Sequence, residues 1–280
     1  MLIKELWSQE DARRLAEFER AARTKDVPGA LFAVERASDD DEKRGRVLLE
    51  RWADRAANYY SRGRVEAPAD ALRWVLVDEL DFRGDPREGL TVGGSYLSQV
   101  IRSRRGLPIL LSSIWMMVGR FAGFDVDGIG LPGHFIVRVS GGTSDAELVD
   151  PFGGGPRLSG SDCKRLVRDL TDGRVSWDDA FLEPTSVDDL LERVLRNLCN
   201  AFLKEGDTDS LYRSLRFIAA LKPEAADIQL SLARLHEELG ATELATTGYQ
   251  RVIDDFASTR EARFAEQRLA RNAAANKLRN

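Results

Sequence analysis

The chain has 280 residues and a net charge of −5 at pH 7, and 43% of its residues are hydrophobic. This composition supports one large packed core or two ordinary ones and excludes a disordered or collagen-like chain. The acidic balance also argues against a general nucleic-acid binder.

Cys163 and Cys199 are the only cysteines and lie far apart, so we expect no disulfide framework, no cysteine-based metal site and a reducing cytoplasmic location. The segment Met1 to Trp7 carries charges where a signal peptide needs an unbroken apolar run. The longest nearly apolar run, Leu107 to Val118, is too short to cross a bilayer. We therefore expect no membrane association, and we expect no cofactor.

Residues 1–84 are predicted to form a helical N-terminal region. Apolar residues recur every three to four positions, as in Leu15, Phe18 and Ala22. The expected breaks are at Pro28-Gly29, at Asp39 to Asp41 and at Gly63.

Residues 85–185 are predicted to form a core with a small antiparallel sheet. Tyr96 to Arg104 is typical of a short helix ended by Gly106. Pro108 suits the first turn of the following helix, which extends to Phe121, is apolar on all sides and should be buried centrally.

After Gly123 the hydrophobic period changes to two, which is typical of strands. Phe135, Val137 and Val139 share one face of the first expected strand, and Ala146 to Asp150 forms its antiparallel partner. If Ser140 pairs with Ser144 or Asp145, His134 lies opposite Asp150 or Pro151. The hairpin is therefore expected to bring His134 and Asp150 together.

Residues 186–280 are predicted to be helical again, after a boundary near Pro184 to Val187. Gly206 and Gly240 lie 34 residues apart within similar helical patterns. That period is typical of tetratricopeptide-type helix pairs. Such repeats bind proteins or peptides, so a partner is expected through this tail.

Four stretches carry a resemblance to a known family: Tyr96-Leu97, Arg104 to Pro108, Leu131 to Phe135 and Val149 to Gly153. Together with the tail, they resemble the transglutaminase-like family of bacterial proteins in the SirB-one class. The resemblance implies an α+β fold with a papain-type core and a tetratricopeptide-like tail.

In that superfamily a Cys opens the central helix, a His begins a later strand and an Asp ends the next one. His134 and Asp150 match the last two positions, but the nucleophile position falls near Pro108, which cannot attack. A thiol acts as a thiolate activated by a helix N-terminus and a nearby imidazole, so both would be needed here.

The resemblance therefore favours a non-catalytic interaction or regulatory module with a vestigial site at His134 and Asp150. An alternative is a hydrolase or acyl-transfer enzyme in which these two residues act without a thiol. A third is one rigid scaffold in which core and tail bind a partner together. Each of the two residues also has a purely structural interpretation. His134 can be a hydrogen-bonded histidine at a strand end, and Asp150 can be a residue that initiates a turn.

The remaining candidate binding and catalytic residues also have ordinary structural interpretations. Arg104 and Arg105 could bind a carboxylate or phosphate, or form a solvated face. Pro132-Gly133 before His134 is similar to a phosphate-binding loop, and we include Gly133 as a candidate binding residue, but the strand, glycine loop and helix that a nucleotide site needs do not follow. Ser112 and Ser113 lie too deep in an apolar helix to replace the thiol, and Cys163 and Cys199 are expected in the core.

Overall fold

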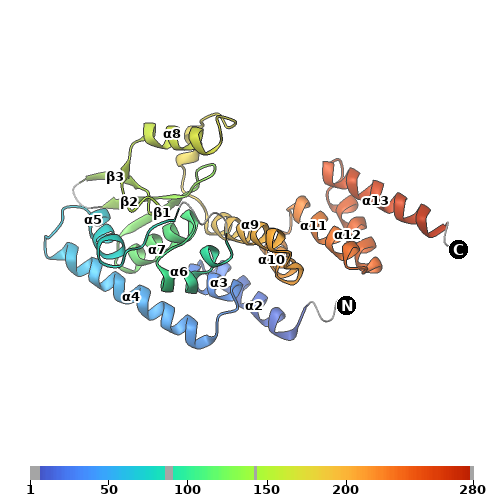
Figure 1. The fold of residues 1–280 in the computed structure, drawn as a ribbon, viewed down its shortest axis with the longest axis horizontal. Helices are drawn as coiled ribbons and strands as arrows, with labels where there is room; N and C mark the ends of the chain where they lie inside the picture. The colour runs from blue at the N-terminus through green and yellow to red at the C-terminus, as the bar shows by residue number, and fades with distance from the viewer. Residues whose placement is uncertain (1–6, 86–90, 142–143, 278–280) are drawn as a thin grey trace.

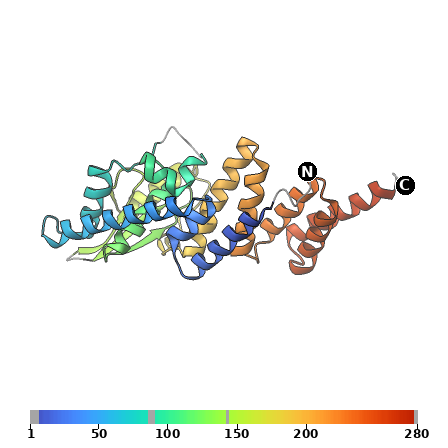
Figure 2. The ribbon, with the colours of Figure 1, turned by 90° about the horizontal axis from the view of Figure 1, so that it is seen from below.

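The computed structural model describes residues 7–85, 91–141 and 144–277 (Figure 1). The fold is α+β, with helices packed around one small antiparallel sheet and a helical extension that carries the C-terminus away from it (Figures 1 and 2). The α-helices are α2 (Gln9–Arg23), α3 (Val27–Val34), α4 (Asp39–Ser61), α5 (Pro68–Arg73), α6 (Leu97–Ser103), α7 (Pro108–Phe121), α8 (Gly160–Leu170), α9 (Val187–Glu205), α10 (Thr208–Leu221), α11 (Ala226–Glu238), α12 (Thr242–Asp255) and α13 (Arg260–Lys277). A π-helical turn, η1 (Trp74–Glu79), and the 3-10 turns η2 (Gly93–Ser95) and η3 (Asp179–Leu182) complete the helical elements.

The N-terminal helices begin at capping residues, which places two of the expected breaks differently. Pro28 lies in the first turn of α3, whose N-cap is Asp26, because proline is tolerated where the helix needs no N–H donor. Asp39 to Asp41 form the first turn of α4 after the N-cap Ser38, since acidic side chains favour the positive end of the helix dipole. These residues therefore start helices rather than interrupt them.

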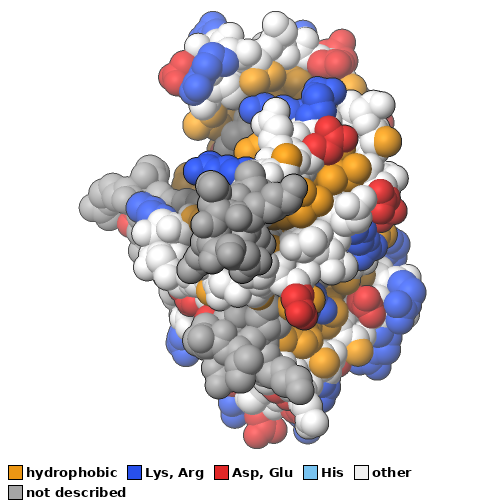
Figure 3. Space-filling model, turned by 90° about the vertical axis from the view of Figure 1, so that its right-hand side faces the viewer, with side chains coloured by type: hydrophobic (Ala, Val, Ile, Leu, Met, Phe, Trp, Pro, Cys, Tyr) orange, Lys and Arg blue, Asp and Glu red, His pale blue; other side chains and the backbone are white. Residues whose placement is uncertain are grey.

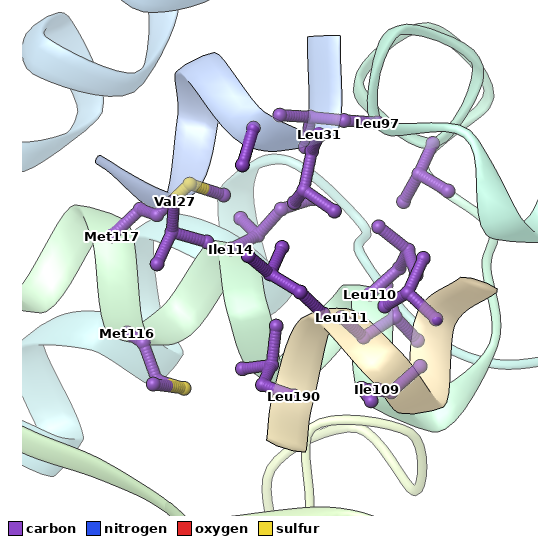
Figure 4. Packing of buried hydrophobic residues seen from close by; sticks show 14 of the residues in the cluster. Val27, Leu31, Leu97, Ile109, Leu110, Leu111, Ile114, Met116, Met117 and Leu190 are labelled. Atoms are coloured by element: carbon purple, nitrogen blue, oxygen red, sulfur yellow. The ribbon is translucent and has the colours of Figure 1, made fainter. Parts of the chain in front are cut away.

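Helix α7 is the centre of the core, as its uniform apolarity predicts. Pro108 occupies its first turn, and the run from Ile109 to Gly119 is buried. Figure 4 shows its side chains packed against Val27 and Leu31 of α3, Leu97 of α6 and Leu190 of α9. Elements from all three predicted regions thus share one core.

The sheet has the strand order β1 (Asp125–Ile129), β2 (Ile136–Gly141), β3 (Ser144–Val149) and β4 (Arg157–Leu158), all antiparallel. The edge strands β1 and β4 were not predicted. Asp and Gly in β1 break the apolar alternation, and β4 has only two residues.

The two faces of β2 pack as predicted. Phe135, Val137 and Val139 join the main core around α7, whereas Ile136 joins a smaller cluster with Cys163 and Val167 of α8. The expected register holds only at the turn, where Gly141 pairs with Ser144. The register then shifts between Val139 and Gly141, so that Val139 pairs with Glu147 and Val137 with Val149. This irregularity adds a residue near the turn and alters the pairing beyond it.

The tail is connected to the core by more than a linker. Thr185 donates its N–H to the Gly128 carbonyl at 2.8 Å, and Pro184 forms a bridge with Ile129. Phe18 of α2 packs edge-on against Phe217 of α10, with ring centroids 5.0 Å apart. The main hydrophobic cluster accordingly runs from Phe18 to Leu235, so it crosses both predicted boundaries.

Helix pairs follow one another along the tail, α9 with α10 and α11 with α12, and α13 packs on α12 (Figure 1). Gly206 and Gly240, the residues that predicted the repeat, sit between the helices of each pair with φ of +72° and +73°. Such left-handed backbone favours glycine and ends a helix.

Candidate functional site

A tight turn places His134 just before β2. The His134 N–H donates to the Leu131 carbonyl at 3.1 Å, and Pro132 and Gly133 occupy the two positions between them. Gly133 has φ of +78°, as the third residue of a type II turn requires. A side chain at Gly133 would also meet Leu170 of α8 at 3.2 Å. Gly133 therefore shapes the backbone that presents His134.

Asp150 lies at the end of β3 and meets this histidine. Its Oδ1 is 2.9 Å from His134 Nε2 and also accepts the Phe152 N–H at 3.0 Å. The side chains of His134 and Asp150 are 6% and 13% exposed. Because an ionised carboxylate only accepts, a neutral imidazole here carries its proton on Nε2. The hairpin thus brings the two residues together despite the shifted register.

The first half of α7 lies against the start of β2, next to this pair. Ser112 Oγ donates to the Phe135 carbonyl at 3.0 Å, which fixes α7 against the start of β2. Pro108 lies four residues earlier and therefore on the same face of the helix. The other imidazole nitrogen of His134, Nδ1, has no hydrogen-bond partner in the part of the chain that the structure describes. Proline has no side-chain group that could bond to this nitrogen.

Residues that the sequence reasoning missed enclose the pair. The Phe152 ring lies edge-on to the His134 ring at a centroid distance of 5.8 Å. Gly84 donates its N–H to the Phe152 carbonyl at 2.9 Å, and a Cβ at Gly84 would lie only 2.2 Å from the Phe152 ring. The sequence signals were the position of Phe152 in the Val149 to Gly153 stretch and a glycine in the Arg-Gly-Asp-Pro stretch, which is equally typical of a loop.

Arg193 of α9 is the other missed residue. Its Nη2 donates to the carbonyls of Leu131 and His134 at 2.8 and 2.7 Å. Its guanidinium also lies over the ring of Phe135, 5.4 Å from the centroid. A helix assigned to the tail therefore contacts the turn that carries His134.

Neither cysteine opens α7. Cys163 is fully buried on α8 and Cys199 is buried on α9. Burial raises the pKa of both thiols, that of Cys199 to about 12, which disfavours a thiolate. Ser113 donates to the Ile109 carbonyl within α7 at 2.7 Å, so both serines are buried and engaged.

Arg104 and Arg105 have partners inside the protein. Arg104 ends α6 in the left-handed conformation, in place of the expected Gly106, and its guanidinium lies 4.7 Å from the ring centroids of both Trp52 and Phe82. Arg105 pairs with the Asp81 carboxylate at 2.7 Å. Ligand binding by these arginines stays a prediction.

The tail contains a groove of about 370 Å³ between α9, α10 and α11. Its floor includes the buried Leu215, Ile218 and Leu235, whereas Leu203 at its edge is 63% exposed. Arg196 and Asp227 form an ion pair of 2.8 Å in its lining. Figure 3 shows the molecule from the tail end, with hydrophobic side chains interspersed among charged ones.

Within residues 7–85, 91–141 and 144–277, no cluster of three or more histidine, cysteine and acidic side chains is arranged to hold a metal ion. Among the helices of these same ranges, none combines the length and apolarity needed to cross a membrane.

The fold and site define an α+β protein in which a His–Asp pair lies where a β-hairpin packs on a central helix, and comparison places it in a family. A family model of the transglutaminase-like superfamily matches residues 44–196, more than half of the chain. The chain therefore belongs to the transglutaminase-like superfamily. It is also similar to proteins named UPF0162. The one from Xylella fastidiosa strain 9a5c is 32% identical over 193 residues, which cover 68% of each chain. The one from Pseudomonas aeruginosa is 26% identical over 173 residues, which cover 62% of this chain and 60% of the relative.

F-box only protein 21 of mouse is 29% identical over 181 residues, and the human protein matches to the same extent. The match covers 61% of this chain but only 28% of the length of either mammalian protein. No solved structure matches the chain.

Proposed function

We propose that this protein is a non-catalytic member of the superfamily that binds a protein or peptide partner through its helical tail. The observation that carries the proposal is the opening of α7, where Pro108 supplies no nucleophile although Ser112, one turn later, is bonded to the carbonyl of Phe135 next to His134. The thiols of Cys163 and Cys199 are buried elsewhere, so neither can take its place. The site is thus expected to be vestigial.

The tail supports the binding role. We infer that its helix pairs are tetratricopeptide-like and that the protein is related to the SirB-one class, in keeping with the 34-residue spacing of Gly206 and Gly240. A groove with an apolar floor suits the insertion of apolar side chains from a peptide. The occurrence of a similar region within the longer F-box only protein 21 is consistent with a module that works alongside other parts.

Paired charge variants test the binding role. Leu203→Glu places a charge at the groove, and Val47→Glu places one on α4 at a similarly exposed position, 54% against 63%. Partners recovered by chemical cross-linking with the wild type should be lost with Leu203→Glu and kept with Val47→Glu. Equal recovery with both variants would contradict binding in the groove.

A catalytic alternative is favoured by one observation: His134 bonds to Asp150 through Nε2, while its Nδ1 has no hydrogen-bond partner among the described residues. An imidazole oriented in this way could activate water for amide or ester hydrolysis. Hydrolysis of p-nitrophenyl esters by the wild type that is abolished in His134→Ala would support this reading. Equal rates for both proteins would support the vestigial site.

A further inference from the structure

Arg193 joins the tail to the turn that presents His134. The two carbonyls that accept from its Nη2 belong to Leu131 and His134, the first and last residues of that turn. The turn itself is closed by one backbone hydrogen bond between the same residues. One guanidinium from α9 therefore holds both ends of the turn.

Neighbouring groups leave little space around this guanidinium. A Cβ at Gly130 would lie 3.2 Å from Arg193 Nη1 and 2.9 Å from Thr185 Oγ1, so a side chain there would displace one of these groups. Burial lowers the pKa of Arg193, and no ion pair with a carboxylate accompanies it in the described ranges. A half-buried cation that lacks a carboxylate partner costs free energy, which its carbonyl bonds and the face of Phe135 offset.

The same helix continues into the groove. Arg196, Cys199, Asn200 and Leu203 of α9 line it, beginning one turn after Arg193. We propose that Arg193 is a positioning residue through which the helical tail fixes the imidazole of His134 against Asp150. The His–Asp pair is then a property of core and tail together, so a displacement of α9 changes the state of His134. This inference holds whether the site is vestigial or active.

Imidazole nitrogen resonances test the proposal directly, since His134 and His236 are the only histidines. Spectra of ¹⁵N-histidine-labelled full-length protein at pH 8 are compared for the wild type, Arg193→Met and the control Arg196→Gln, with His236→Gln used for assignment. The wild type and the control should show one tautomer of His134, protonated on Nε2. In Arg193→Met, both ring resonances should move toward the averaged values of a freely exchanging imidazole.

Arg193→Met fills a similar volume without a charge, so it is the variant best suited to fold. Arg193→Gln, whose amide reaches fewer acceptors, is the second variant, and Arg193→Lys should restore part of the wild-type pattern. Unchanged His134 ring resonances in a folded Arg193→Met or Arg193→Gln protein would overturn the proposal. A loss of the His134 signature in Arg196→Gln as well would also overturn it, because the effect would then not be specific to Arg193.

Discussion

His134 Nε2 and Asp150 Oδ1 are 2.9 Å apart although the residues are separated by 16 positions in the chain, and the same oxygen accepts the Phe152 N–H. One carboxylate oxygen therefore ties the start of β2 to the loop that follows β3. This arrangement orients the imidazole and stabilises the loop at the same time.

Replacing Asp150 should show how much this contact contributes to the stability of the fold. Asp150→Ala removes the acceptor for two partly buried donors, and we expect a loss of about 1–3 kcal/mol in the free energy of unfolding. Asp150→Asn keeps one acceptor oxygen and should cost less. Urea denaturation measures both, with Asp169→Ala at a side chain 58% exposed as the control. A loss no larger than that of the control would contradict a stabilising role for the pair.

Pro108→Cys should place a reactive thiol at the start of α7. The helix N-terminus and the nearby His134 favour the thiolate, so alkylation by iodoacetamide at pH 7 should be about tenfold faster than at an exposed Val47→Cys thiol. Mass spectrometry separates the introduced thiols from the buried Cys163 and Cys199. Addition of His134→Ala should remove most of the advantage. Equal alkylation rates at positions 108 and 47 would show that Pro108 does not mark the nucleophile position.

Ser112 and Ser113 should differ in their contribution to stability, although both are fully buried. Ser112 bonds across to the Phe135 carbonyl, whereas Ser113 bonds to a carbonyl of its own helix. Ser112→Ala leaves that acceptor without this partner and is expected to cost about 1–2 kcal/mol. Ser113→Ala should cost less, because the helix hydrogen bond at Ile109 remains. Thermal unfolding of the two variants provides the comparison, and a reversed order would contradict it.

Glu35 predicts a pH dependence of stability. Its carboxylate accepts the N–H and Oγ of Ser98 at 3.1 and 2.9 Å, and burial raises its pKa from 4.5 to about 7. Because the folded pKa exceeds the unfolded one, the contribution of Glu35 to stability is full below pH 4.5 and is lost as the pH rises through 7. The wild type should therefore lose up to about 3 kcal/mol from this group between acidic and alkaline pH.

Urea denaturation at pH 5 and pH 8 checks this expectation. Glu35→Gln should remove most of the difference between the two conditions, whereas Glu243→Gln on the exposed face of α12 should leave it in place. An identical pH dependence in the wild type and Glu35→Gln would rule out Glu35 as its source.

The segment around Pro184 should resist proteolysis, because Pro184 and Thr185 are paired with β1. Proteinase K is expected to cut first near Arg174, whose side chain is 77% exposed. N-terminal sequencing of the fragments locates the cuts. Early cleavage between residues 183 and 187 would indicate that core and tail are separate bodies joined by a free linker.

The chain by itself determined the features that depend on local pattern. The apolar run after Pro108 predicted the buried central helix, and the alternation after Phe135 predicted which residues share one face of the strand. The pairing of strands across one turn was enough to bring His134 to Asp150. In each case the relevant contacts join residues that are close in sequence or related by one hairpin.

The tertiary structure alone decided what holds the site in place. Gly84, Phe152 and Arg193 come from three separate parts of the chain, and no periodicity links them. The register near Gly141 and the left-handed Arg104 depend likewise on packing against neighbouring elements. Local patterns record which surfaces are apolar, but the pairing of one buried polar group with another is settled only when distant segments pack together. The hydrogen bonds from Arg193 to the turn that carries His134 are contacts of that kind.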